Sequence, residues 1–194
     1  MDRPAAFYFD LASPEAYLSG ERILSLMPAP VEWIGVSATE LPDPPDPGAQ
    51  LEEAARLVPE RGLQALVPPS PFPFDSRTAM LAATYARQIG RAVPFALAAW
   101  RQAFAAGRPL DEDGIVIAGS ACEMHPAALL KSTGTASVAR ALDEATTQAR
   151  LRGVRSVPAV WIADAGGNGE GLAFHGDSRL EEAARALGET VPSP

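Results

Sequence analysis

The stretch FYFDLASPEAYLSG, residues 7–20, joins an apolar run to a segment with helical spacing. Phe7-Tyr8-Phe9 reads as a buried strand that stops at Asp10, and Ser13-Pro14 opens the helix. Serine is a good N-cap and proline suits the first helical position, so a capped helix is predicted here. An active site at the same helix N-terminus is compatible with that cap, because the helix dipole favours a negative charge there.

Outward from this stretch, the order of elements indicates an α/β fold. Strands are predicted near residues 5–9 and 31–36 around a helix over 14–27, which implies parallel pairing with a right-handed crossover. Residues 37–150 contain two proline-rich stretches and a mainly helical block, without a strand after residue 76. Strand signals return near 158–163 and 171–175, followed by a last helix in RLEEAARALG.

This order is typical of a thioredoxin-like βαβ–ββα domain with an all-helical insertion between its halves. The expected division is a discontinuous thioredoxin-like domain of residues 1–36 and 151–194, and an insertion of residues 37–150. A chain of 194 residues, 47 % of them hydrophobic, is long enough to bury the core of such an arrangement.

The charge balance restricts the partners. The chain carries 24 acidic against 16 basic residues, a net charge of −8, which argues against nucleic acid or an anionic membrane as a partner. We find no stretch long and apolar enough for a membrane span, and the start lacks the apolar region of a signal peptide. One cysteine allows no internal disulfide. We therefore expect a soluble, cytoplasmic protein.

Two segments besides Ser13-Pro14 are candidates for chemistry. VPAVWI places a proline at the start of a strand, where thioredoxin-like folds have a cis-proline that leaves the backbone of the preceding residue free for a ligand, so a cis Val157–Pro158 bond facing Ser13 is predicted. In GDSRLEEA, Asp177 or Ser178 is expected to cap the last helix, whose free N–H groups can also hold a carboxylate.

The residue at the helix start decides between redox and other chemistry. Thioredoxin-like redox enzymes carry Cys-x-x-Cys there, whereas this chain has Ser-Pro-Glu-Ala at residues 13–16. A hydroxyl excludes dithiol exchange at this position but can donate a hydrogen bond to the sulfur of an external thiol. Cys122 is interpreted as a small core residue, and the two isolated histidines, His125 and His175, predict no metal site.

The chain resembles 2-hydroxychromene-2-carboxylate isomerases, which belong with the kappa-class glutathione transferases in the DsbA-like branch of the thioredoxin superfamily. Nearly the whole chain is covered by the resemblance, and its motifs occur in this order: FYFDLASPEAYL, VPPSPFPFDSRTAM, FAAGRPLDED, HPAALL, RGVRSVPAVWI and FHGDSRL. It implies a homodimer that uses glutathione and acts on a small aromatic substrate.

The resemblance also implies residue roles. Ser13 would hydrogen-bond the glutathione sulfur, Val157 and the cis-proline Pro158 would hold the cysteinyl part, and Asp177 and Ser178 would hold the γ-glutamyl end. The substrate is expected near three aromatic residues of the insertion, Phe72, Phe74 and Trp100. The implied reaction is reversible addition of the thiolate to a double bond, rotation, and elimination of the thiol.

Two other functions stay open. One is a glutathione transferase or a DsbA-family oxidoreductase by lineage, against which the missing Cys-x-x-Cys argues. The other is a non-catalytic protein that binds a thiol or a peptide.

Overall fold

The computed structural model describes residues 5–167 and 169–190 and contains a four-stranded sheet in the order β2-β1-β3-β4. Strand β1 (Ala5–Phe9) pairs in parallel with β2 (Glu32–Gly35) and antiparallel with β3 (Ala159–Gly167), which pairs antiparallel with β4 (Glu170–His175). All five residues of β1 are buried, because it is a central strand with both faces covered. The four strands predicted from the sequence are confirmed.

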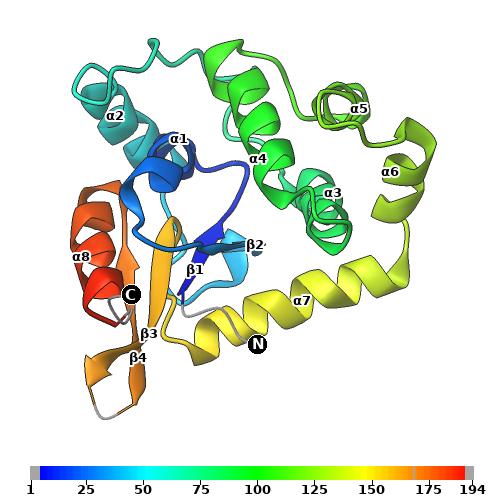
Figure 1. Cartoon of the computed structure of the whole chain (residues 1–194). Coiled ribbons are helices and arrows are strands. Elements are labelled where there is room, and N and C mark those ends of the chain that lie inside the picture. The colour runs from blue at the N-terminus through cyan, green and yellow to red at the C-terminus, as the bar shows by residue number, and fades with distance from the viewer. Residues whose placement is uncertain (1–4, 168, 191–194) are drawn as a thin grey trace.

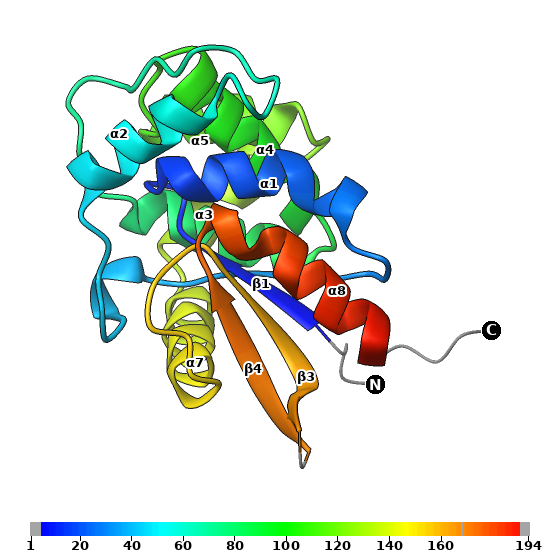
Figure 2. The same ribbon diagram turned by 90° about the vertical axis from the view of Figure 1, so that its left-hand side faces the viewer.

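Helices cover both faces of this sheet. Helices α1 (Pro14–Leu26) and α8 (Leu180–Thr190) lie side by side on one face, and α7 (Ala136–Leu151) lies on the other (Figure 2). Helix α1 ends where Pro28 follows, since proline cannot continue a helix without losing a backbone hydrogen bond. At its other end, α1 begins only a few residues after β1 ends, so the N-terminus of α1 lies at that end of the sheet.

Every element between β2 and β3 is helical, and all residues from 37 to 150 are described. Most of these elements gather beyond α1, on the side away from the sheet (Figure 1). The last of them, α7, lies on the opposite face of the sheet (Figure 2). The elements are a 3-10 turn (Ala38–Glu40), α2 (Pro47–Leu57), α3 (Arg77–Gln88), α4 (Ala92–Trp100) with a π-helical continuation (Arg101–Ala105), α5 (Glu112–Ser120), α6 (Pro126–Thr133) and α7. The expectation of a helical block without a strand is confirmed.

Helix α2 begins earlier than the sequence pattern indicates. The residues PDPPDPG, 42–48, read as a loop, but Pro47 and Gly48 already belong to the helix. The carboxylate of Asp46 accepts a hydrogen bond from the backbone N–H of Ala49 at 2.7 Å, and Pro47 occupies the first helical position. This start places Gln50 in the first turn of α2, next to the start of α1.

The core between the sheet and the helices is built on aromatic rings. Phe7, Phe9 and Trp33 on the strands surround Trp100 of α4, and the ring centroids of contacting pairs are 5.0–6.5 Å apart. Gly20 of α1 makes room for this cluster, because a Cβ atom there would lie 2.5 Å from Cζ3 of Trp100. The cluster fixes α1 and α4 against β1.

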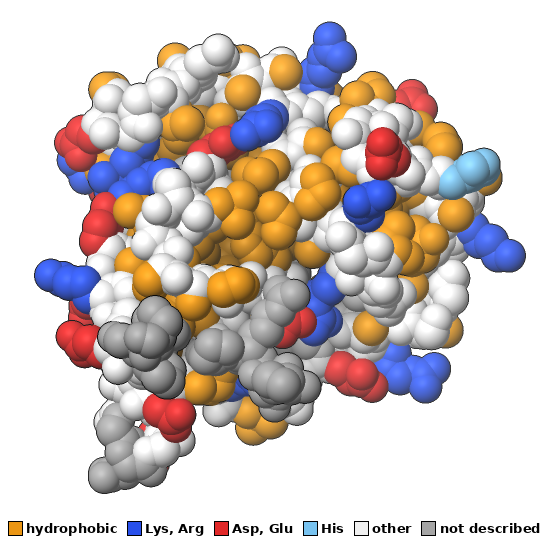
Figure 3. All heavy atoms as spheres, viewed as in Figure 1, with side chains coloured by type: hydrophobic (Ala, Val, Ile, Leu, Met, Phe, Trp, Pro, Cys, Tyr) orange, Lys and Arg blue, Asp and Glu red, His pale blue; other side chains and the backbone are white. Residues whose placement is uncertain are grey.

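Hydrophobic side chains also gather in the middle of the surface that Figure 3 presents. A groove of about 370 Å³ lies between the end of α1 and β2 and is lined by hydrophobic residues: Ile23, Leu24, Met27, Pro28, Ala29, Pro30, Val31 and Trp33. None of the described helices is both long and apolar enough to cross a membrane.

Candidate functional site

Ser13 stands at the junction of β1 and α1 and caps the helix. Its Oγ accepts a hydrogen bond from the backbone N–H of Ala16 at 3.0 Å, and its own N–H donates to the carbonyl of Asp10 at 3.2 Å. Only 3 % of Ser13 is exposed, so the hydroxyl lies inside the protein rather than at its outer surface. The predicted cap is confirmed, and its local cause is the Ser-Pro pair itself.

The Val157–Pro158 peptide bond is cis, as predicted. The carbonyl of Val157 accepts a hydrogen bond from Nε2 of Gln50 at 2.8 Å. The carbonyl of Pro158 is already used within the fold, because it accepts a hydrogen bond from the backbone N–H of Gly176 at 2.8 Å. Just before β3, the Val157 carbonyl therefore faces the Gln50 side chain, which comes from the helical block.

Gln50 connects Ser13 with Val157. Its Oε1 accepts a hydrogen bond from Oγ of Ser13 at 2.8 Å, while its Nε2 donates to the Val157 carbonyl at 2.8 Å and to Oε2 of Glu15 at 3.2 Å. One side-chain amide thus spans the gap between the helix cap and the cis-proline loop. Sequence reasoning missed Gln50, since nothing local to α2 indicates which residues its first turn will meet.

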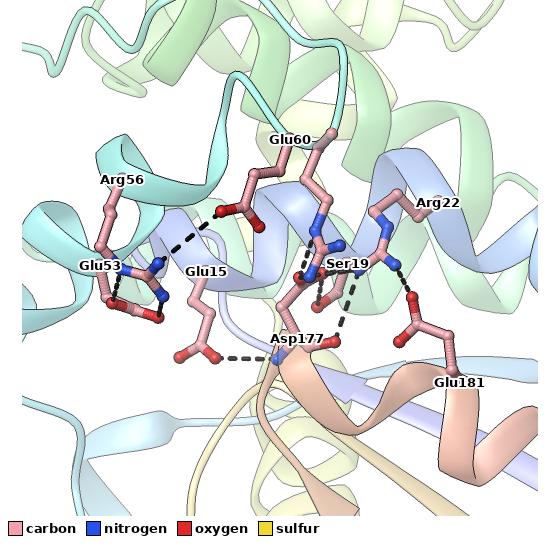
Figure 4. A network of polar contacts seen from close by, with 9 residues as sticks. Glu15, Ser19, Arg22, Glu53, Arg56, Glu60, Asp177 and Glu181 are labelled. Atoms are coloured by element: carbon pink, nitrogen blue, oxygen red, sulfur yellow. Dashed lines mark hydrogen bonds and ion pairs between the residues drawn. The ribbon is translucent and has the colours of Figure 1, made fainter.

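The segment before α8 is held by buried charges. Asp177 has no exposed surface, and its carboxylate accepts hydrogen bonds from Ser19, Arg22 and Arg61, with Arg22 at 2.7 Å and Arg61 at 3.0 Å. Figure 4 shows Arg22 reaching it from α1. The predicted capping role of Asp177 is wrong, because its carboxylate is bound by two arginines and a hydroxyl and Gly176 stands at the N-cap instead. The role of Asp177 in binding a ligand stays a prediction.

One backbone N–H group of this segment also has a partner within the fold. The N–H of Asp177 donates to Oε1 of Glu15 at 2.8 Å, and Glu15 points toward it in Figure 4. Burial is the main cause that raises the pKa of Glu15, and this hydrogen bond partly offsets the rise. Ser178 is exposed. Among the N–H groups expected to hold a ligand carboxylate, that of Asp177 therefore binds the carboxylate of Glu15.

A cleft of about 370 Å³ opens beside Ser13. It lies between the β1–α1 turn, the 3-10 turn, the start of α2 and the start of α3, and the larger part of its surface is apolar. The apolar side chains in its lining are those of Ala12, Ala38, Pro45, Pro47, Pro73, Phe74 and Met80. Its polar lining comes from Asp10, Ser13, Ser37, Thr39, Glu40, Gln50, Asp75, Ser76 and Arg77. A cleft of this size and character suits a small, largely apolar molecule with a few polar groups.

Asp10 forms part of the cleft wall and was not predicted as a site residue. Its Oδ1 accepts a hydrogen bond from the N–H of Ala12 at 2.9 Å, and its Oδ2 accepts one from the N–H of Ala38 at 3.0 Å. Burial raises the pKa of Asp10, and these two bonds work against the rise. Asp10 thereby ties together the two turns between which the cleft opens. The abrupt end of the apolar run at residue 10 was its sequence signal.

The three aromatic residues expected to contact substrate have different positions. Phe74 lines the cleft, and the ring of Phe72 packs against the ring of Phe74, with centroids 6.4 Å apart. Trp100 is 0 % exposed and belongs to the core cluster with Phe7. The expectation for Trp100 is therefore corrected: α4 is fully enclosed at this point, so the indole has no access to the cleft.

The remaining reactive groups lie outside this site. Cys122 is buried, its Sγ donates to the carbonyl of Ala118 at 3.2 Å, and burial raises the pKa of its thiol. His175 accepts a hydrogen bond at Nε2 from the backbone N–H of Arg155 at 3.0 Å, and burial lowers its pKa. Among residues 5–167 and 169–190, no three histidine, cysteine, aspartate or glutamate side chains gather as a metal site would require.

No curated protein sequence matches the chain significantly. In structure it is similar to 2-hydroxychromene-2-carboxylate isomerase, with a TM-score of 0.80 and 19 % identity over 95 % of this chain and 94 % of that one. It is also similar to a putative protein disulfide isomerase from Nitrosomonas europaea, with a TM-score of 0.75 and 14 % identity over 96 % and 95 % of the two chains.

A third similar structure is the cytosolic disulfide reductase DsbM from Pseudomonas aeruginosa, with a TM-score of 0.65 and 12 % identity over 96 % and 97 % of the chains; DsbM has also been solved with GSH. At such identities these likenesses establish the fold. The model of the DSBA-like thioredoxin domain matches residues 6–188, almost the entire length. The chain belongs to the DsbA-like thioredoxin domain family.

Proposed function

We propose that this protein is an isomerase that uses glutathione or another small thiol and acts on an aromatic substrate similar to 2-hydroxychromene-2-carboxylate. The observation that carries the proposal is the placement of Ser13. Its hydroxyl stands at the N-terminus of α1, faces the Val157 carbonyl across one amide group, and lines a mostly apolar cleft.

The residues fit a small peptide thiol in kind. Ser13 offers a hydroxyl donor and Val157 a carbonyl acceptor, and the amide of Gln50 shows that an amide group fits between them. The isomerase and the GSH-bound disulfide reductase among the similar structures add to this support. A bound thiol would supply the nucleophile that adds reversibly to the substrate double bond and so permits rotation about it.

Each residue of the chain has a defined task in this proposal. The Ser13 hydroxyl donates a hydrogen bond to the thiolate sulfur, and the dipole of α1 lowers the pKa of the thiol further. Val157 aligns the peptide part of the thiol. Phe74 and Met80 bury the aromatic part of the substrate in the cleft. A homodimer remains a prediction of the sequence resemblance, and a cytoplasmic location remains a prediction of the composition.

Redox function receives less support. Dithiol exchange needs two cysteines at the start of α1, where this chain has Ser13 and Ala16, and its single cysteine, Cys122, is buried between α5 and α6. A non-catalytic protein that binds a thiol or a peptide is the second candidate. It is favoured by the Val157 carbonyl, which accepts a hydrogen bond from a side-chain amide as it would from the amide of a bound peptide.

The test is a titration of the purified protein with glutathione, followed by the ultraviolet band of bound thiolate, and then turnover of 2-hydroxychromene-2-carboxylate with and without glutathione. Thiolate at neutral pH and thiol-dependent turnover are expected. Thiol binding without turnover would favour the non-catalytic candidate, and turnover unaffected by thiol would refute the proposed cofactor.

A further inference from the structure

The thiol site of the proposed function is filled by the chain's own side chains. The Ser13 hydroxyl, the Val157 carbonyl and the Asp177 N–H all have hydrogen-bond partners at 2.8 Å, supplied by Gln50 and Glu15. They belong to Ser13, Val157 and Asp177, residues that the resemblance assigns to three successive parts of glutathione. A ligand that uses them must first replace the internal partners.

Gln50 resembles the ligand that it would exclude. Its primary amide presents an N–H group to the Val157 carbonyl and a carbonyl oxygen to the Ser13 hydroxyl, as a peptide group of an incoming molecule could. It also lines the cleft, so a ligand beside Ser13 and the Gln50 side chain compete for the same space. An internal group that satisfies the same donor and acceptor lowers the affinity for any external one.

Gln50 can leave without unfolding the helix that carries it. Helix α2 is capped by Asp46, and the backbone N–H of Gln50 is bonded to the carbonyl of Asp46 at 3.0 Å, independently of its side chain. Gly48 and Ala49 beside it are exposed. A rotation of the partly exposed Gln50 side chain toward solvent therefore frees both Ser13 and Val157 while the backbone stays in place.

We infer that Gln50 is a specificity-determining residue that competes with the peptide amide of the thiol ligand and sets the affinity of the site for it. This inference rests on the proposed function. Gln50 acts on the free protein only: once the ligand is bound, Ser13 faces its sulfur and Val157 its amide. The site therefore favours a thiol that also carries a peptide group, such as glutathione, because that group can replace the hydrogen bonds of the Gln50 amide.

The experiment is calorimetric titration of glutathione into the wild type, Gln50→Ala, and Gln148→Ala, an equivalent substitution on the exposed face of α7. Gln50→Ala removes from the free state the two hydrogen bonds that the ligand must displace, together with the longer one to Glu15, and is expected to tighten binding about 10-fold. Gln148→Ala should bind like the wild type. The pKa of the bound thiol, from its ultraviolet band, should be the same in all three proteins.

The outcomes separate this inference from the proposed function. Equal or weaker binding by Gln50→Ala, with binding by the wild type, overturns the role of Gln50 and leaves the thiol-dependent function standing. A changed pKa of the bound thiol shows that Gln50 touches the bound ligand and likewise overturns the inference. Absence of binding by both proteins refutes the inference and the proposed cofactor together. Unfolding in urea confirms that each variant is folded.

Discussion

Replacement of Ser13 by alanine tests the site at its centre. The hydroxyl makes two contacts, as acceptor from the Ala16 N–H at 3.0 Å and as donor to Oε1 of Gln50 at 2.8 Å. Ser13→Ala removes both and leaves the rest of the β1–α1 turn, including the Asp10 carbonyl bond, in place. The substitution therefore affects stability through the cap and function through the hydroxyl.

The expected loss of stability follows from these two contacts. An N-cap contributes about 1 kcal/mol, and a second hydrogen bond at a nearly buried position adds on the order of 1 kcal/mol. The free energy of unfolding should fall by about 2 kcal/mol, which corresponds to a decrease in Tm of roughly 4–8 °C for a domain of this size. A bound thiol should lose a charge-assisted hydrogen bond, so its pKa should rise by about 1–2 units.

Ser13→Asp separates the two effects. Aspartate is a good N-cap, so much of the cap's stability should remain, but its negative charge at the sulfur position should abolish thiolate binding. The assays are urea unfolding and turnover against pH with glutathione present. An unchanged free energy of unfolding in Ser13→Ala would refute the cap energetics, and an unchanged pH profile of turnover would reduce Ser13 to a structural residue.

Three further predictions concern the frame of the site. Gly20→Ala should destabilise the protein by about 1–3 kcal/mol in urea unfolding, because the new Cβ would lie 2.5 Å from Cζ3 of Trp100. Asp177→Asn should cost about 3 kcal/mol or more by the same measurement, since it leaves two largely buried arginines without their shared carboxylate. The pKa of His175 is lowered in the fold, so its contribution to stability is present above its unfolded pKa of about 6.5 and is lost as the pH falls through the lower folded value. His175→Gln should therefore reduce the drop in Tm between pH 7.5 and pH 5.

Matched substitutions give each of these predictions a control. Gly188→Ala on α8 has its nearest neighbour at 3.8 Å and should be neutral or stabilising, so equal effects of the two glycine substitutions would contradict the packing argument. Asp43→Asn breaks an exposed ion pair with Arg155 and should lower the free energy of unfolding far less than Asp177→Asn does. A His175→Gln protein with the same acid-side decrease in Tm as the wild type would contradict the assignment to His175.

Local signals in the sequence were sufficient for much of the fold. The cap of Ser13 on Ala16 spans three residues, and its chemistry is contained in Ser-Pro followed by an apolar helical stripe. The order of strands and helices came from periodicity and from proline and glycine positions, and the cis Val157–Pro158 bond from the place of a proline within that order. The sequence did not reveal the start of α2, because the cap at Asp46 lay within a stretch rich in proline.

The occupants of the site were decided only by tertiary packing. Gln50 is 37 residues from Ser13 and 107 from Val157 in sequence. Glu15 is 162 residues from Asp177, whose N–H donates a hydrogen bond to it. Such pairs depend on how α2 and α8 pack against α1, which no local pattern encodes. The core position of Trp100 has the same cause. Gly20, which lies 80 residues earlier in the chain, leaves the space that the Trp100 indole fills. The sequence alone thus determined the elements and the residue at the helix start, whereas the approach of distant helices determined which side chains meet there.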